Sequence, residues 1–155
     1  MSGHVVDVRS EPARPTAVVA QTTTWREYSA LWPKLLDEVY GFVRGHPELS
    51  PTPHGKELWR NVMLYLDDTP AVEVGVLVAR AFPAAGRVTA SALPAGSVAT
   101  TLHRGPYAQL DQAHRAVQDA AAARGLALAG PRWEIYGHWR ADPRELETEV
   151  YYLLR

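Results

Sequence analysis

Near the start of the chain, hydrophobic residues first stand in short continuous runs and then recur with the period of a helix. Residues 4–8 and 16–23 are short apolar stretches separated by prolines, which indicates two extended segments. Between positions 25 and 44 the apolar residues recur every three or four positions, as on one face of a helix: Leu31, Leu35, Val39 and Phe42. Thr24 is in place to cap the start of this helix and Gly45 to end it. We therefore predict strands followed by a helix.

The next part of the chain predicts a pair of strands. Residues 46–58 are rich in proline and are interpreted as a loop. Residues 61–66 (NVMLYL) and 72–82 (VEVGVLVARAF) have the apolar, β-branched composition of strands, and the turn sequence DDTP at 67–70 joins them. Glycine and proline around 83–96 then indicate a linker.

The second half of the chain repeats this pattern. Residues 97–103 predict a strand, and residues 106–124 predict an alanine-rich helix that ends at Gly125. Two further strands are predicted at 132–139 and 147–154. Both halves therefore have the order strand, helix, strand, strand.

The two halves can also be aligned residue by residue. Three stretches of the first half match three of the second: 18–31 with 97–110, 61–66 with 132–137, and 72–78 with 148–154. This alignment places Tyr65 on Tyr136 and Met63 on Glu134. Because similarity that keeps its order over several segments indicates duplication, we predict an α+β fold of duplicated strand–helix–strand–strand modules.

Length and composition narrow the class of protein. A chain of 155 residues has the size of one domain, so we expect a single domain over 1–155 with modules at about 4–82 and 97–154. Lys and Arg number 16 against 17 Asp and Glu, a net charge of −1, which gives no electrostatic reason to expect a nucleic-acid partner. The absence of cysteine excludes disulfides, thiolate catalysis and cysteine metal sites.

Targeting and cofactor motifs are also missing from the sequence. The N-terminal residues lack the apolar core of a signal peptide, and no stretch approaches the roughly 20 apolar residues of a membrane span. Neither a metal-binding HExxH spacing nor a glycine-rich phosphate loop occurs. We therefore expect a cytoplasmic protein with no membrane partner, no metal and no cofactor.

Four segments resemble the GyrI-like small-molecule-binding family. They are NVMLYLDDTPAVEVGVLV (61–78), LPAGSVATTLHRGPYAQL (93–110), GPRWEIYGHW (130–139) and LETEVYYLL (146–154). This family has the fold of the effector-binding domains attached to AraC-type and MerR-type regulators. The resemblance implies an antiparallel sheet backed by two helices, with a ligand cleft where the modules meet. It also implies a glutamate that points into the cleft from the strand after the second helix, which is the position of Glu134.

Alternation along the strand around Glu134 divides its neighbours between two faces. Trp133 and Ile135 share one face, and Glu134, Tyr136 and His138 share the other. We expect the apolar pair to pack against the alanine-rich helix, which would leave the carboxylate on the open side of the sheet. A carboxylate among aromatic rings is unfavourable unless a partner pairs with it, which makes Glu134 the main candidate for function.

Three functions remain open. The first is binding of lipophilic, often cationic aromatic small molecules, because a cation pairs with the carboxylate and with the ring faces. The resemblance implies an alternative, the hydrolysis of cyclopropane-bearing DNA-alkylating natural products. Glu134 would then activate a water, and Tyr65, Tyr107 or Tyr136 would bind the ligand carbonyl. A gyrase-inhibitor-like protein-binding module is the third possibility. No helix-turn-helix segment accompanies the domain, which favours a stand-alone member of the family.

Besides Glu134, the predicted cleft residues are mostly aromatic. Five Trp and seven Tyr stand against two Phe, and Trp and Tyr combine a large apolar face with a polar group, as suits a ligand pocket. The candidates are Met63, Tyr65, Tyr107, Tyr136, Trp32, Trp59, His103 and Tyr151. Among these, Trp59 would cover the cleft and His103 would reach it from a strand end.

Overall fold

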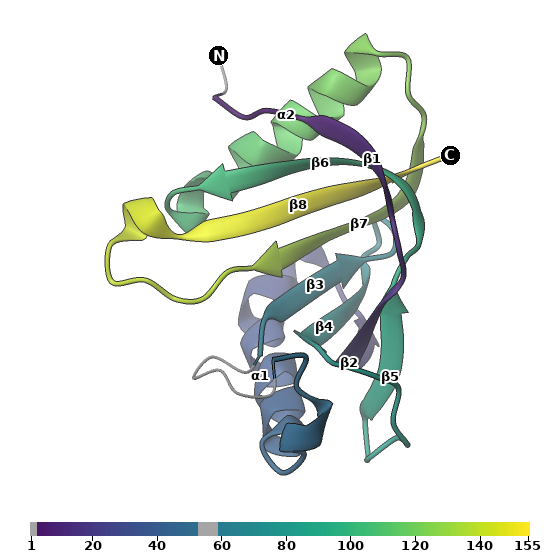
Figure 1. Cartoon of the computed structure of the whole chain (residues 1–155), viewed down its shortest axis with the longest axis vertical. Helices are drawn as coiled ribbons and strands as arrows, with labels where there is room; N and C mark the ends of the chain where they lie inside the picture. The colour runs from purple at the N-terminus through teal and green to yellow at the C-terminus, as the bar shows by residue number, and fades with distance from the viewer. Residues whose placement is uncertain (1–2, 53–58) are drawn as a thin grey trace.

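Eight strands and two helices make up the described chain, residues 3–52 and 59–155 of a computed structural model (Figure 1). The strands are β1 (Asp7–Glu11), β2 (Arg14–Thr22), β3 (Asn61–Tyr65), β4 (Ala71–Leu77), β5 (Val88–Leu93), β6 (Gly96–Arg104), β7 (Leu128–Tyr136) and β8 (Glu147–Leu154). The helices are α1 (Trp25–Val43) and α2 (Leu110–Ala123), and short 3-10 turns lie at η1 (Pro47–Leu49), η2 (Tyr107–Gln109) and η3 (Pro143–Glu145). Neither α1 nor α2 is long and apolar enough to span a membrane.

The strands form one antiparallel sheet in the order β1–β6–β8–β7–β3–β4–β2–β5. The order β6–β8–β7 on one side is the reverse of β3–β4–β2 on the other, as a two-fold axis between β7 and β3 requires. At this junction Met63 lies directly opposite Glu134, the two positions that the sequence alignment matched. The predicted α+β fold of duplicated modules is confirmed.

The segment predicted as a linker, 83–96, contains the strand β5. This strand pairs with β2, while β1 pairs with β6, so each leading strand joins the outer edge of the other module. Strand β5 was not predicted because the alanine, serine and threonine of its sequence, VTASAL, give a weak apolar alternation. The repeat therefore includes a leading strand before the four predicted elements.

The strand registers also correct one part of the sequence alignment. Val18 of β2 lies opposite Gly75, and Thr100 of β6 lies opposite Tyr151. Because Gly75 and Tyr151 occupy matching positions of the two modules, Val18 corresponds to Thr100 and not to Ser97. The error arose because short runs of small and β-branched residues align almost equally well in several registers.

Helix α1 begins where its sequence predicts. The Glu27 backbone N–H donates to Thr24 Oγ1 at 3.2 Å, which makes Thr24 the N-cap. Leu35, Val39 and Val43 recur on one side of the helix and are buried against the sheet. The helix is therefore held by the apolar stripe that the sequence shows.

Both helices cover the same face of the sheet. Met63, Glu134 and Val150 lie side by side across β3, β7 and β8, and directly opposite residues of a sheet share a face. Met63 belongs to the core under α1, and Val150 belongs to the core under α2. Glu134 therefore points into the helical layer, at the boundary between the cores under α1 and α2.

The expected orientation of β7 was wrong. Trp133 and Ile135 do not contact the alanine-rich helix; they are buried on the opposite face with Leu77, Leu93 and Val98. Alternation defines two faces of a strand but does not say which face the helices cover. Here the sheet is strongly twisted, with β6 and β8 running across the view in Figure 1 and β5 running down it, and its second face has an apolar core of its own.

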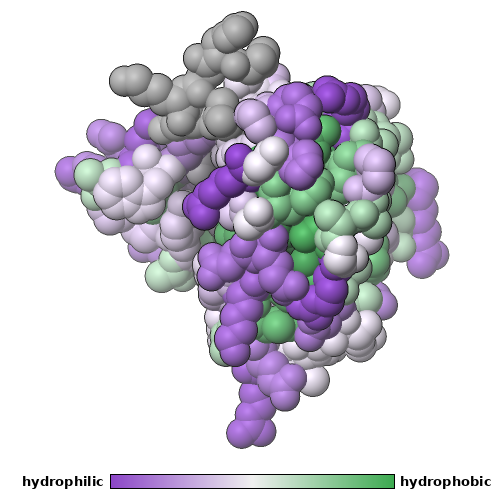
Figure 2. All heavy atoms as spheres, turned by 90° about the horizontal axis from the view of Figure 1, so that it is seen from below, coloured by the Kyte–Doolittle hydropathy of each residue, from purple (hydrophilic) through white to green (hydrophobic). Residues whose placement is uncertain are grey.

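One end of the molecule exposes apolar surface between hydrophilic side chains. Figure 2 shows this end from below, the end where η1 lies in Figure 1. Near η1, the rings of Phe42 and Phe82 are 5.0 Å apart and His46 stacks on Phe42 at 4.3 Å. These residues line a cavity of about 390 Å³. None of its lining residues contacts Glu134, so we treat it as separate from the candidate site.

Candidate ligand-binding site

Glu134 is a buried carboxylate at the centre of the sheet. It extends from β7 toward the helices, and only 5 % of its surface is exposed. Three side chains from β3, β7 and α2 bind its two oxygens. The carboxylate therefore has hydrogen-bond partners before any ligand is bound, which reduces the penalty for burying it.

Two tyrosines bind one oxygen of the carboxylate. The hydroxyls of Tyr65 and Tyr136 donate to Glu134 Oε1 at 2.9 and 2.8 Å. These tyrosines occupy matching positions in the two modules, so the pseudo-two-fold axis brings both to the same atom. Burial first, and the Glu134 charge second, raise the pKa of both hydroxyls well above the ordinary tyrosine value. They therefore remain protonated donors at neutral pH.

A histidine on α2 binds the other oxygen. His114 Nε2 lies 2.6 Å from Glu134 Oε2, and His114 Nδ1 lies 2.8 Å from the hydroxyl of Tyr152 on β8. The Gln118 amide donates to that same hydroxyl at 3.3 Å, and burial raises the pKa of Tyr152 to about 12. The sequence analysis did not select His114, and its position at the edge of the apolar stripe of α2 was the only available signal.

One side of Glu134 opens into an aromatic cavity of about 390 Å³. It is lined by Tyr28, Trp32, Asn61, Met63, Tyr65, Tyr107, Leu110, Glu134, Tyr136, Gly137 and Trp139. Of the described residues that line it, only Glu134 has an acidic or basic side chain. We call this space the aromatic cavity.

The other side of Glu134 faces a polar cavity of about 370 Å³. It is lined by Trp25, Tyr65, Asp111, His114, Arg115, Gln118, Arg132, Glu134 and Tyr152. The Arg132 guanidinium lies 5.6 Å from the Trp25 ring and 5.7 Å from the Tyr65 ring, and it pairs with Asp68 at 2.9 Å. A cation of the protein itself therefore occupies the aromatic faces on this side.

The structure brings most of the predicted cleft residues together. Met63, Tyr65, Tyr107, Tyr136 and Trp32 all line the aromatic cavity with Glu134. Five lining residues that the sequence analysis did not select are Tyr28, Asn61, Leu110, Gly137 and Trp139. They come from both helices, β3 and the segment after β7, so only the folded arrangement identifies them.

Three predicted residues lie elsewhere. Trp59 packs against the core under α1 and is not among the residues that line either cavity at Glu134. His103 is buried at the end of β6, where its Nε2 lies 3.0 Å from the Pro106 carbonyl oxygen and its ring stacks on His4. Tyr151 points to the opposite face of β8 and stacks on Trp133, because odd and even positions of a strand face opposite ways.

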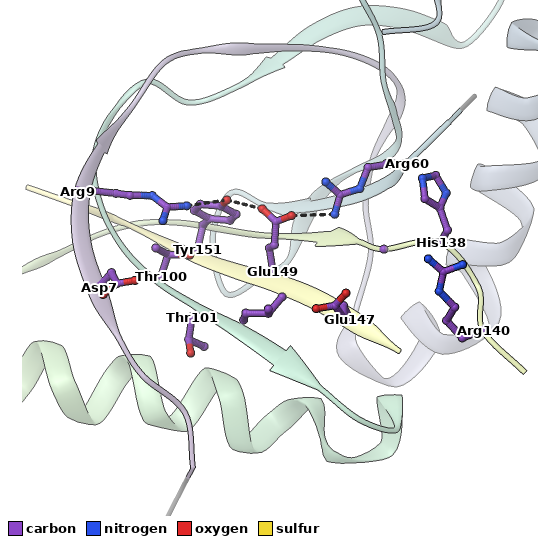
Figure 3. A pocket seen from close by; sticks show the side chains of 12 residues that line it. Asp7, Arg9, Arg60, Thr100, Thr101, His138, Arg140, Glu147, Glu149 and Tyr151 are labelled. Atoms are coloured by element: carbon purple, nitrogen blue, oxygen red, sulfur yellow. Dashed lines mark hydrogen bonds and ion pairs between the residues drawn. The ribbon is translucent and has the colours of Figure 1, made fainter. Parts of the chain in front are cut away.

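A larger cavity of about 530 Å³ lies on that opposite face, along β8 and β1 (Figure 3). The Tyr151 hydroxyl donates to Glu149, and Arg60 binds the other oxygen of Glu149 at 2.8 Å. Burial opposes ionisation of Glu149, but the hydrogen bonds from Tyr151 and Arg60 lower its pKa. Arg9 donates to Tyr151 at 3.3 Å. The charged side chains of Arg60 and Glu149 at the centre of this cavity therefore pair with each other.

No metal centre is formed by the described residues. Within residues 3–52 and 59–155, no group of three or more His, Asp or Glu is placed to hold an ion. Glu134 and His114 form a pair without a third acidic or imidazole ligand. The chemistry available at the site is therefore that of a carboxylate, an imidazole and phenolic hydroxyls.

Comparisons with known proteins identify the fold. No family model matches the sequence, and no curated protein matches it. Among solved structures, the EcmrR C-terminal domain superposes with a TM-score of 0.78 at 19 % identity and covers 99 % of each chain. SAV2435 bound to tetraphenylphosphonium superposes with a TM-score of 0.68 at 10 % identity, over 97 % of this chain and 94 % of that one. A hydrolase from Listeria innocua superposes with a TM-score of 0.62 at 12 % identity, over 97 % of this chain and 91 % of that one.

At these identities the likeness establishes the fold. The whole described chain follows the duplicated α+β architecture of these structures, which is the fold implied by the resemblance to the GyrI-like family. What the neighbours bind or catalyse belongs to them, and the function of this chain is inferred from its own site.

Proposed function

We propose that this protein binds lipophilic aromatic cations in the aromatic cavity, with Glu134 as the counter-charge. The observation that carries the proposal is the charge distribution around the cavity. A single carboxylate, buried among rings, is the only charged group among its described lining residues. The lining of this cavity favours a cation over other ligands, because a cation interacts both with the carboxylate and with the electron-rich ring faces.

Contacts with the carboxylate and the rings would supply a large part of the binding free energy of a cation. A charge pair at about 4 Å contributes roughly 4 kcal/mol at an effective dielectric near 20, before desolvation is subtracted. Each ring face adds about 0.5–2 kcal/mol as a cation–π contact. A volume of about 390 Å³ lies within the range of about 300–1,000 Å³ that is typical of small-molecule sites. A compact, multi-ring cation therefore suits the cavity.

The rim of the cavity also favours an aromatic ligand. Trp139 is 73 % exposed and Tyr107 is 43 % exposed, although both are large apolar side chains that line the cavity. Tyr107 contacts Tyr136 edge to face, with ring centroids 5.7 Å apart, which connects the rim to the carboxylate. A bound ring system would cover these exposed faces and remove apolar surface from water.

The fold neighbours support this ligand class. SAV2435 was determined bound to tetraphenylphosphonium, a lipophilic aromatic cation, and it shares this fold over nearly the whole chain. The polar cavity on the other side of Glu134 suits a cation less well, because Arg132 already lies against its rings. The aromatic cavity is therefore the proposed site.

A rhodamine-type dye should quench the tryptophan emission of this protein with micromolar affinity, about −8 kcal/mol. Trp32 and Trp139 line the proposed site, so a bound dye lies within efficient energy-transfer range. Unlabelled tetraphenylphosphonium should reverse the quenching by competition. Triphenylphosphine oxide, which carries similar rings without a net charge, is the control and should compete much more weakly. Equal competition by the charged and the neutral compound would contradict a role for Glu134 as counter-charge.

Hydrolysis is a second candidate, favoured by the contacts of Glu134. A carboxylate 2.6 Å from an imidazole that is itself held by Tyr152 is an arrangement suited to general-base catalysis. In the reaction that the resemblance implied, a water that loses a proton to Glu134 would attack one cyclopropane carbon as the ring C–C bond breaks. The electron pair of that bond would move to the ligand carbonyl, and the carbonyl oxygen would take up a proton. A hydrolase from Listeria innocua among the fold neighbours supports this candidate.

The two candidates are separated by incubation with a cyclopropane-bearing alkylating compound followed by mass analysis. A catalyst gives a product that is heavier by one water, at many turnovers per protein molecule, whereas a binder returns the compound unchanged. If turnover occurs, Glu134→Gln should reduce it about 10²–10⁴-fold. Turnover that survives this substitution would place the base elsewhere.

A further inference from the structure

We infer that His114 couples ligand binding to a proton, so that a cation entering the aromatic cavity displaces a proton from His114. This inference rests on the proposed function, and it begins with the unequal partners of the two carboxylate oxygens. Oε1 is bound by two tyrosine hydroxyls, whereas Oε2 is bound by His114 at 2.6 Å. The tyrosines stay neutral near physiological pH because burial raises their pKa values. Histidine is the residue type whose charge changes in that range.

The hydrogen bond at His114 Nδ1, the nitrogen that does not contact Glu134, can form with the imidazole neutral or charged. When the imidazole is neutral, its Nε2–H donates to Glu134 and the Tyr152 hydroxyl donates to Nδ1. When the imidazole is charged, Nδ1–H donates to the Tyr152 oxygen instead, at the same 2.8 Å separation. The Gln118 amide donates to that oxygen in either state. A hydroxyl both donates and accepts, so the proton can be gained or lost without moving a side chain.

The other charged groups around His114 are largely paired among themselves. On α2 itself, Asp111 and Arg115 pair at 3.4 Å. From β7, Arg132 pairs with Asp68. The remaining titratable groups that line this side are Tyr65 and Tyr152, from β3 and β8. Glu134 is thus the charged group in direct contact with the imidazole.

A ligand cation and a protonated His114 therefore neutralise the same carboxylate from opposite sides. The ligand approaches from the aromatic cavity and His114 from the polar cavity, and Glu134 lines both. Two cations sharing one carboxylate repel each other, so each weakens the binding of the other. Thermodynamic linkage makes this effect reciprocal. The bound state holds fewer protons than the free state, and raising the pH must therefore tighten the binding of a permanent cation.

Titration calorimetry with tetraphenylphosphonium from about pH 5.5 to pH 8 tests this coupling. We expect Kd to fall by about tenfold as pH rises through the histidine range. Repeating the titration in buffers of different ionisation enthalpy should show release of up to one proton at the acidic end. In His114→Gln the pH dependence should flatten, because an amide cannot take up the proton. His46→Gln, between α1 and η1 and away from the site, is the matched control and should behave as the wild type.

Tyr152→Phe provides a second variant in case His114→Gln does not fold. Loss of the hydroxyl removes the acceptor of the charged Nδ1–H, and hydrogen bonds to charged groups are the stronger ones. The pH dependence should therefore move to lower pH in Tyr152→Phe and stay in place in Tyr151→Phe, which removes a hydroxyl from the opposite face of the same strand. A wild-type Kd that is constant with pH, or a full pH dependence in His114→Gln, would overturn the inference. Absence of wild-type binding at every pH would instead overturn the proposed function.

Discussion

Glu134→Gln is expected to weaken the binding of tetraphenylphosphonium by about 1–3 kcal/mol, the part of a charge pair of roughly 4 kcal/mol that remains after desolvation, or roughly fivefold to 150-fold in Kd. Glutamine keeps the size of the side chain and still accepts from Tyr65 and Tyr136, so the cavity keeps its shape while its charge is lost. Binding of a neutral aromatic compound should change little. Titration calorimetry at about pH 8, where the imidazole proton competes least, measures both affinities.

Glu149→Gln is the matched control for this substitution. Glu149 is also a partly buried glutamate in a strand, bound by a tyrosine hydroxyl and by a cationic side chain, but it faces the cavity on the other side of the sheet. Its replacement should leave both affinities unchanged. If the two variants lose cation binding equally, the effect is one of overall charge, and Glu134 is not the counter-charge of the ligand.

The stability of Glu134→Gln should change by only about 1 kcal/mol in either direction. The sequence alone suggested a buried carboxylate that is unfavourable unless a partner pairs with it, so that its replacement would leave the fold no less stable. The structure shows instead that both carboxylate oxygens are hydrogen-bonded. The substituted amide can keep these contacts, because the His114 imidazole has a second neutral tautomer that accepts at Nε2. Urea unfolding measures this change alongside the binding experiment.

The fold was predictable from the sequence because its elements alternate between two clear hydrophobic periods. The helix at α1 has an apolar residue every third or fourth position and a capping threonine, and the central strands are continuous apolar runs. Duplication then predicted two equivalent modules, and the resemblance to the GyrI-like family implied the antiparallel sheet backed by two helices. Strand β5 escaped because its small side chains carry little periodic signal.

The site was predictable only in part. Glu134 stood out because an acid replaces an apolar residue in one copy of a repeat, and Tyr65 and Tyr136 followed from the same alignment. Alternation could not show that Glu134 faces the helices, because a strand with apolar residues on both faces has no intrinsic inner side. His114 could not be assigned to the site from the sequence because its partner, Glu134, lies 20 positions further along the chain. Only the packing of α2 on the sheet brings the two residues together.

Removing both tyrosine hydroxyls from Glu134 is expected to destabilise the protein by more than the sum of the two single losses. In Tyr65→Phe or Tyr136→Phe, the remaining hydroxyl still satisfies Oε1, so each change costs about 1 kcal/mol. In the double variant no hydroxyl of the described site reaches Oε1, although His114 still binds Oε2, and a buried charged acceptor left without a donor costs about 3 kcal/mol or more. Urea unfolding of all four proteins gives the coupling energy directly. Tyr151→Phe combined with Tyr136→Phe, which serve different carboxylates, should be additive.

Alkaline unfolding of the same proteins tests independently whether the hydroxyls of Tyr65 and Tyr136 have raised pKa values in the folded protein. Burial, and then the Glu134 charge, raise the pKa values of Tyr65 and Tyr136 in the folded protein, whereas tyrosines of the unfolded chain ionise near pH 10. Above about pH 10 the unfolded state releases protons that the folded state retains. Stability is therefore fully present below that pH and decreases above it, by up to about 1.4 kcal/mol per pH unit for each such tyrosine. The double phenylalanine variant lacks both contributions, so its unfolding free energy should fall less steeply with pH than that of the wild type. Equal slopes would show that these hydroxyls ionise as freely in the folded protein as in the unfolded chain, which is incompatible with two buried donors held on a carboxylate.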